Sequence, residues 1–319
     1  MGDALMLLSR FADSAFWMGR YLERAESLAR LLMVTESFAA DQESDEAWAP
    51  ILQVFADTDA FSERGKPLTA LNVARFYLAD PNNSNSVILA ATMMKENARS
   101  LRHLLSTESW RQVSLFQKSV AALQKRRFAL SKMSEICADI RDGSCTLRGV
   151  LDATCYRDEV WRFLQLGAAL ERADQSTRLI DIKYFRFDRD DDDDEPAPPD
   201  VAWWNTLLRS ASGYHAFQRR YSFNADPADA ARFLICDKHL PLSVTNAVEA
   251  ACEQLARLDE DFGARPGAAV SRAAKALRER LDAPPARLSG RSLHRYLDQI
   301  QQEIITLANV LDDRYFSPA

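Results

Sequence analysis

The chain has 319 residues and a formal net charge of −6, from 40 Lys and Arg residues against 46 Asp and Glu residues. Without a basic excess, a broad nucleic-acid-binding surface is not expected, and no apolar run approaches the roughly 18 residues of a membrane span. Ten glycines and twelve prolines are too few for many glycine-rich phosphate loops, for many tight hairpins or for a disordered chain.

Apolar residues recur at spacings of three and four along most of the chain, without the alternation that is typical of strands. This pattern predicts an all-α protein, a multi-helix bundle. Asn85 or Ser86 is a predicted N-cap, and Ser243 is another. The expected helices are, in chain order, 10–39, 45–56, 67–79, 86–105, 108–125, 128–153, 157–185, 200–220, 227–237, 243–262, 268–282 and 291–315.

One segment breaks the helical pattern. The stretch DRDDDDDEPAPPD, residues 188–200, holds seven carboxylates between Asp188 and Glu195, followed by prolines. Its like charges repel one another and its prolines stop a helix, so we expect an acidic, solvated linker. It has no spaced ligand pattern that would favour a metal-binding loop.

The cysteines indicate the compartment. Their number is odd and they form no CxxC pair, which favours free thiols in a reducing environment. The first ten residues also lack the basic leader of a signal peptide, so we expect a cytoplasmic protein. The five are Cys137, Cys145, Cys155, Cys236 and Cys252.

The chain resembles itself in two blocks that occur in the same order. The segment GRYLERAE, from Gly19, reappears as GAALERAD, from Gly167, and RFYLADPNNSNSV, from Arg75, matches RFLICDKHLPLSV, from Arg232. These matches predict an internal two-fold pseudo-repeat. We expect one half-repeat over 1–150 and a second over 151–319, with the acidic linker inside the second half and both halves in one domain.

At 100° per residue, the repeated helix has an apolar arc opposite a polar strip. The spacing of four between acid and Arg allows an ion pair within each copy. A glycine in mid-helix costs about 1 kcal/mol against alanine, so its presence in both copies favours a close approach by another group. The candidate strip comprises Glu23, Arg24, Glu26 and Arg30 in the first copy and Glu171, Arg172, Asp174 and Arg178 in the second, with Arg20 as a further candidate.

Three interpretations of this strip stay open. It could be a solvated face with weak ion pairs, a set of structural Arg–carboxylate pairs that lock the halves together, or a site whose spare donors bind an anion. A raised carboxylate pKa in a pocket holding both motifs would favour an enzyme.

The segment LLSRFADSAFWMGRYLERAESLARLLMV (Leu7–Val34) resembles the opening of the bacterial alpha-E domain family, and RDEVWRFLQLGAALERADQSTRLIDI (Arg157–Ile182) resembles its internal copy. KENARSLRHLLSTESW, from Lys95, also fits the family pattern. This likeness adds Asn97, Arg99, Arg157 and Asp158 as further candidates. The pair Ala168–Ala169 departs from the Arg-Tyr that the family usually repeats, which weakens the second site.

The resemblance implies an all-helical bacterial protein that works with a circularly permuted ATP-grasp protein, and with a transglutaminase-like protein in some systems. The motifs HExxH, GxSxG, GxGxxG and the Walker loop are absent, and the four histidines show no ligand spacing. We therefore expect no metal and no cofactor. A non-catalytic partner of an amide ligase that modifies peptides or amino acids is favoured over a structural role for the motifs. An enzyme that acts on a carboxylate- or phosphate-bearing substrate comes last.

Overall fold

A computed structural model describes residues 2–42, 45–125, 129–182, 201–221 and 226–317. These residues form helices joined by short loops, and no strand occurs among them, so the all-α prediction is confirmed. The predicted linker at 188–200 lies outside the described residues. The α-helices are α1 Gly2–Gln42, α2 Ala49–Val54, α3 Thr58–Ser62, α4 Ala70–Ala79, α5 Val87–Ser100, α6 Thr107–Ala121, α7 Met133–Thr154, α8 Glu159–Asp181, α9 Val201–Ser210, α10 Tyr214–Arg220, α11 Pro227–Cys236, α12 Val244–Phe262, α13 Gly267–Asp282 and α14 Gly290–Leu311.

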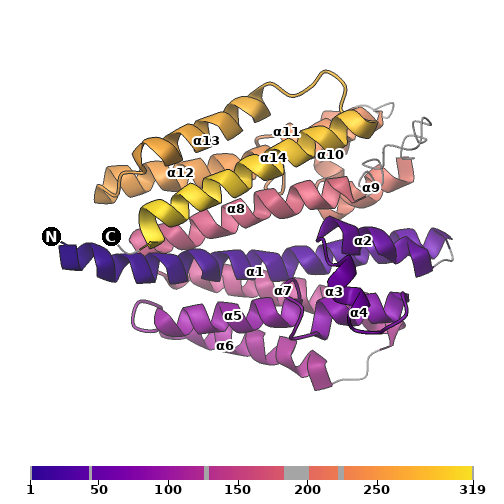
Figure 1. Cartoon of the computed structure of the whole chain (residues 1–319), viewed down its shortest axis with the longest axis horizontal. Coiled ribbons are helices and arrows are strands. Elements are labelled where there is room, and N and C mark those ends of the chain that lie inside the picture. The colour runs from indigo at the N-terminus through magenta and orange to yellow at the C-terminus, as the bar shows by residue number, and fades with distance from the viewer. Residues whose placement is uncertain (1, 43–44, 126–128, 183–200, 222–225, 318–319) are drawn as a thin grey trace.

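The centre of the bundle is the pair α1 and α8, which have the most extensive mutual contact of any two elements. The two helices lie side by side and run in the same direction (Figure 1). On one side of the pair, α5 and α7 pack against α1, and α6 covers them from outside (Figure 1). On the other side, α12 and α14 pack against α8, and α13 covers them from outside (Figure 1). The core is therefore continuous across the molecule, with the α1–α8 contact in its middle.

Glycine permits this close contact. A Cβ atom on Gly19 would overlap the backbone carbonyl of Leu164, and a Cβ atom on Gly167 would overlap that of Phe16. The mid-helix glycines that the sequence singled out therefore lie where two backbones touch, and any larger residue would push the helices apart.

Local sequence explains several helix ends. Ser86 and Ser243 accept hydrogen bonds from the backbone N–H groups of Leu89 and Asn246, which satisfies donors in the first turns of α5 and α12. The predicted cap Ser243 is confirmed, and of the two alternatives Asn85 and Ser86, the cap is Ser86. Asn85 instead hydrogen-bonds Asp57.

The predicted helix at 200–220 is two helices, α9 and α10. Ser212 between them has a φ of 55°, in the left-handed region that a helix cannot continue through. The short α3 was not predicted, because its five residues give too little of a periodic pattern.

Candidate functional site

The first Glu-Arg cluster is built around Glu171 of α8 and receives its cations from α1. Nε of Arg20 donates to Oε2 of Glu171 at 2.7 Å. Arg24 donates from both Nε and Nη2, at 2.6 and 3.0 Å, so it grips the carboxylate with two bonds. Gln175, one turn further on, adds a fourth hydrogen bond, at 3.0 Å. We call these four residues the Glu171 cluster.

The second cluster is built around Glu23 of α1 and receives cations from two helices. Arg172 of α8 donates from Nε and Nη2 to the two Glu23 oxygens, at 3.1 and 2.8 Å. Arg148 of α7 places Nη2 3.0 Å from Glu23 and 2.6 Å from Glu26. Arg30 grips Glu26 from within α1. These five residues form the Glu23 cluster.

The two motifs thus cross reciprocally. The Arg of each motif pairs with the Glu of the other, Arg24 with Glu171 and Arg172 with Glu23. The clusters differ in their second cation, because Ala168 occupies the position in α8 that corresponds to Arg20 in α1. At Glu23, that charge comes instead from Arg148 on α7.

Burial and charge fix the state of the carboxylates. The side chains of Glu23 and Glu171 are 2% and 0% exposed. Burial alone raises the pKa of Glu171, but Arg24 and Arg20 outweigh it and hold the pKa well below its usual value. Burial likewise opposes a lower pKa at Glu26, and Arg148 and Arg30 overcome it. These two carboxylates are ionised at neutral pH and have no proton to give.

Arg30 of the Glu23 cluster and Arg178 each connect two distant segments of the chain through a backbone carbonyl. Arg30 pairs with Glu26 and donates from Nη1 to the carbonyl of Ser210, at the end of α9, at 2.6 Å. Arg178 pairs with Asp174 and donates from Nη1 to the carbonyl of Val54, at the end of α2, at 2.7 Å. Each arginine therefore satisfies a helix C-terminus that belongs to the other half.

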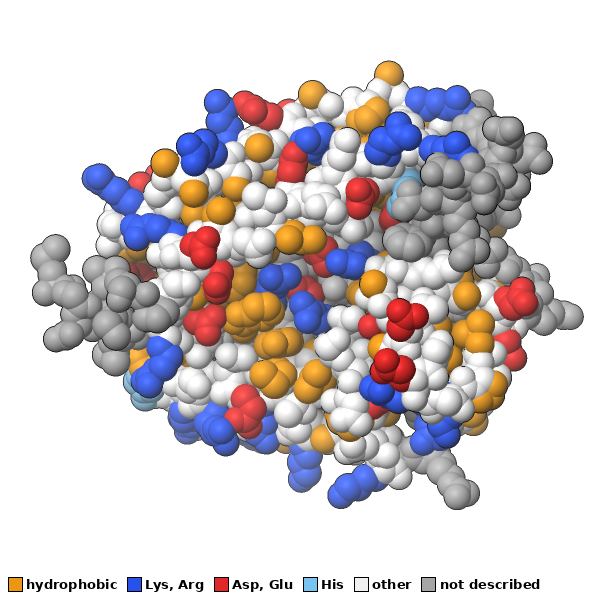
Figure 2. Space-filling view, in the orientation of Figure 1, with side chains coloured by type: hydrophobic (Ala, Val, Ile, Leu, Met, Phe, Trp, Pro, Cys, Tyr) orange, Lys and Arg blue, Asp and Glu red, His pale blue; other side chains and the backbone are white. Residues whose placement is uncertain are grey.

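The polar strip is a buried inter-helix layer and not a solvated helix face. Its arginines keep part of their guanidinium surface exposed, with exposed side-chain fractions of 13% for Arg20, 18% for Arg24 and 35% for Arg148. Figure 2 shows Lys and Arg side chains, with acidic and hydrophobic neighbours, over the middle of α1 where it lies beside α8. Aromatic rings support the cations here, since Arg20 lies over Trp17 and Arg24 over Tyr21.

The remaining candidates lie outside both clusters. Asn97 donates to the carbonyl of Met93 within α5, and Arg99 forms an exposed ion pair with Glu96. Arg157 pairs with Asp152 and stacks on Trp161, whereas Asp158 is the N-cap of α8. All four have local roles in the structure.

Sequence reasoning missed Arg148 and Gln175. Arg148 belongs to α7, which has no repeated motif, so only the packing of α7 against α1 reveals it. Gln175 carried a usable signal, because it follows Glu171 by four residues and therefore lies on the same helix face.

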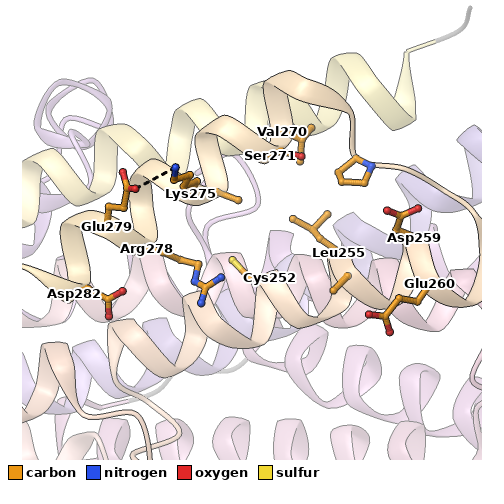
Figure 3. Close-up of a pocket in the computed structure, with 13 residues that line it drawn as sticks. Cys252, Leu255, Asp259, Glu260, Val270, Ser271, Lys275, Arg278, Glu279 and Asp282 are labelled. Atoms are coloured by element: carbon orange, nitrogen blue, oxygen red, sulfur yellow. Dashed lines mark ion pairs between the residues drawn. The ribbon is translucent and has the colours of Figure 1, made fainter.

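Two hollows lie away from the clusters. One, of about 440 Å³, runs between α12 and α13, with Cys252 and Leu255 beneath charged side chains that include the Lys275–Glu279 ion pair (Figure 3). The other, of about 360 Å³, is lined by Arg64, Lys66 and Phe76 beside α4. Neither contains a residue of the Glu-Arg motifs. Over the described ranges, no three His, Cys, Asp or Glu side chains are grouped so that they could hold a metal ion.

Comparison with known proteins identifies the family. Residues 7–316 match a family model described as Alpha-E, a predicted alpha-helical domain with a conserved ER motif. The chain belongs to the Alpha-E family. The resemblance expected from the sequence is confirmed. The Glu-Arg pairs Glu23–Arg24 and Glu171–Arg172 of this Alpha-E protein lie in the two crossed clusters.

The Alpha-E chain also resembles longer proteins. Uncharacterised proteins of Mycobacterium bovis and Mycobacterium tuberculosis are each 25% identical to it over 282 residues, which cover 82% of this chain. The chain spans about 30% of the length of these curated relatives. No solved structure matches it significantly. Within the part of the Alpha-E chain that the structure describes, no helix is long and apolar enough to cross a membrane.

Proposed function

We propose that this Alpha-E protein is a non-catalytic helical partner of a circularly permuted ATP-grasp amide ligase, in a cytoplasmic system that modifies peptides or amino acids. A transglutaminase-like protein is a further candidate member of the system. The partner's identity comes from the family resemblance, and the partner role itself has separate support from the relatives and from the chemistry of the clusters.

The observation that carries the partner role is the length of the relatives. In the mycobacterial proteins, the matching stretch is about 30% of a much longer polypeptide. In those proteins the helical domain is covalently joined to other segments. We infer that the domain in this chain works beside a separate polypeptide in a similar way.

The chemistry of the clusters favours this role over catalysis. A general acid needs a pKa near the working pH, whereas Arg24 and Arg20 hold the pKa of Glu171 far below it. Each cluster carboxylate already accepts short hydrogen bonds from two or more donors, which leaves little capacity to take up a proton from a substrate. At Glu171, the enzyme alternative therefore lacks a group that could donate a proton at neutral pH.

We infer further that residues 1–150 and 151–319 are two copies of one ancestral unit within a single domain. Reciprocal contacts support this inference. Gly19 and Gly167 each touch the other helix, Arg30 and Arg178 each cap a helix of the other half, and Arg64–Asp80 recurs as Arg220–Asp237. The pair of caps Ser86 and Ser243 follows the same order.

A second function for the motifs is a structural lock between the halves. The crossed pairs Arg24–Glu171 and Arg172–Glu23 favour it, because each joins α1 to α8 across the centre of the core. This role is compatible with the partner role, since a rigid body presents a defined surface to its partner.

Affinity purification tests the partner proposal. The tagged full-length protein is purified from its native cells at moderate salt, and co-purifying proteins are identified and quantified by mass spectrometry. The expected result is a circularly permuted ATP-grasp protein in near-stoichiometric amount, which then re-forms the complex from purified components. Recovery of the chain alone, or of unrelated proteins only, would overturn the proposal.

A further inference from the structure

The Glu23 cluster has more positive than negative charge once its neighbour Arg141 is included. Arg141 lies on α7, two turns before Arg148, so both project from one face of that helix. Arg30 and Glu26 are among the charges that act on Arg141. Four guanidinium groups therefore face the two buried carboxylates Glu23 and Glu26, and the exposed Asp142 also acts on Arg141, so positive charge is in excess around this cluster.

The guanidinium group of Arg141 has few hydrogen-bond acceptors among the described residues. Among the described residues, its Nη1 has one hydrogen-bond partner, the thioether sulfur of Met33 at 3.7 Å, and a thioether is a weak acceptor. Its Nε is buried without a hydrogen-bond partner among the described residues. The adjacent Asp142 is exposed and forms no ion pair with it in the described ranges. The side chain as a whole is half-buried, so the end of its guanidinium group remains open to an added acceptor.

The other two arginines keep spare donors at the surface. Arg148 uses only Nη2 for its two glutamates, and Arg172 uses Nε and Nη2, so neither Nη1 is engaged within the described part of the chain. Both Nη2 atoms lie on the same oxygen of Glu23, at 3.0 and 2.8 Å. The two guanidinium groups are therefore close enough to share one anion. Their side chains are 35% and 18% exposed, so a solute can reach them.

We propose that Arg141, Arg148 and Arg172 form a binding site for an oxyanion, a phosphate or carboxylate group of a small molecule or peptide. The planar forks of Arg148 and Arg172 supply donors that match such a group. Arg141, two turns away along α7, adds a charge that forms no ion pair with a carboxylate of the described residues, although Glu26 and Asp142 lie near enough to act on it. The electrostatic environment agrees, because burial and the neighbouring Arg30 lower the pKa of Arg141. This site does not depend on the proposed ligase partner.

Thermal unfolding tests the proposal with inorganic phosphate and with acetate as separate probes, each compared with sodium chloride at equal ionic strength. The expected result is a Tm rise of roughly 2–5 °C in at least one oxyanion, beyond the chloride effect. A response to phosphate alone that is lost in Arg141→Gln identifies a phosphate site, and a response to acetate alone that is lost in the same variant identifies a carboxylate site; a phosphate response that the variant keeps would be a general salt effect. Equal Tm values in all three salts would overturn the proposal.

The variant Arg141→Gln separates specific binding from general screening. It removes a cation that has no carboxylate partner, so the variant folds at least as well as the wild type in chloride. Its oxyanion affinity, measured by calorimetry, is expected to fall roughly tenfold or more, as for the loss of a charge-assisted hydrogen bond. Arg99→Gln, at an exposed pair far from α7 in sequence, is the matched control and keeps the wild-type affinity. Unchanged affinity in Arg141→Gln would overturn the site.

Discussion

Gly19 of α1 lies directly against the backbone carbonyl of Leu164 of α8, and no side chain separates them. Gly167 repeats this relationship against Phe16. The close approach brings Arg24 and Arg172 within reach of the opposite glutamates, so the glycines and the Glu-Arg pairs form one arrangement.

Replacing either glycine with alanine should destabilise the protein. In Gly19→Ala the new methyl group overlaps a backbone carbonyl that cannot rotate away, which costs more than the roughly 1 kcal/mol that alanine gains in helix propensity. We expect a net loss of about 1–3 kcal/mol in the free energy of unfolding, measured by urea denaturation. Gly149→Ala on α7 is the control, because open space surrounds that glycine, and it should stabilise the protein by about 0.5–1 kcal/mol. Equal effects at both positions would contradict the close approach.

Replacing Glu171 with an uncharged residue should strongly lower the stability of the folded protein. Glu171→Gln leaves Arg20 and Arg24 as partly buried cations without their carboxylate, and breaking one partner of such a pair typically costs about 3–5 kcal/mol. Glu96→Gln removes the carboxylate of an exposed pair and should change stability by no more than about 0.5 kcal/mol. Urea denaturation of both variants checks the difference, and similar small losses would refute a buried lock.

The lowered pKa of Glu171 predicts a dependence of stability on pH. In the unfolded chain this carboxyl titrates near 4.5, whereas in the folded protein its pKa lies lower. The unfolded state therefore binds protons first, so the stabilisation is complete above about pH 4.5 and is lost as the pH falls towards the folded pKa. Between about pH 6 and pH 3.5, the free energy of unfolding should decrease more steeply in the wild type than in Glu171→Gln. If the free energy of unfolding falls with pH at the same rate in both proteins, Glu171 does not contribute to the acid sensitivity of the fold.

Arg178 should hold α2 in place. Lysine at this position keeps the charge but has no planar fork, so Arg178→Lys cannot grip Asp174 and also reach the carbonyl of Val54. We expect faster amide hydrogen exchange in α2, with a local stability loss of about 1–3 kcal/mol. Arg280→Lys, whose arginine joins α13 to α14 through Glu303 and Gln299, should leave exchange in α2 unchanged. Unaltered exchange in α2 of Arg178→Lys would contradict the anchor.

The sequence predicted the parts of the site that depend on local spacing. The ion pairs Glu26–Arg30 and Asp174–Arg178 follow from a spacing of four on a helix and are confirmed. The mid-helix glycines correctly predicted a close approach of another group, which is the backbone of the opposite helix. Glycine destabilises a helix relative to alanine, so a lack of space for a side chain explains its presence.

Long-range packing was beyond the reach of sequence spacing. Arg148 and Arg141 enter the site only because α7 packs against α1, and no local pattern distinguishes them from other helix arginines. The break between α9 and α10 depends on the φ of one residue, Ser212, which helical periodicity does not encode.

A double-mutant cycle on Glu171 and Arg24 tests the central claim, that crossed Glu-Arg pairs lock α1 to α8. Glu171→Gln, Arg24→Gln and the double variant are compared with the wild type by urea denaturation. We predict a coupling energy of about 1.5–3 kcal/mol, above the roughly 0.5 kcal/mol expected for the exposed Glu96–Arg99 pair. A coupling energy no larger than that of the exposed pair would contradict the lock.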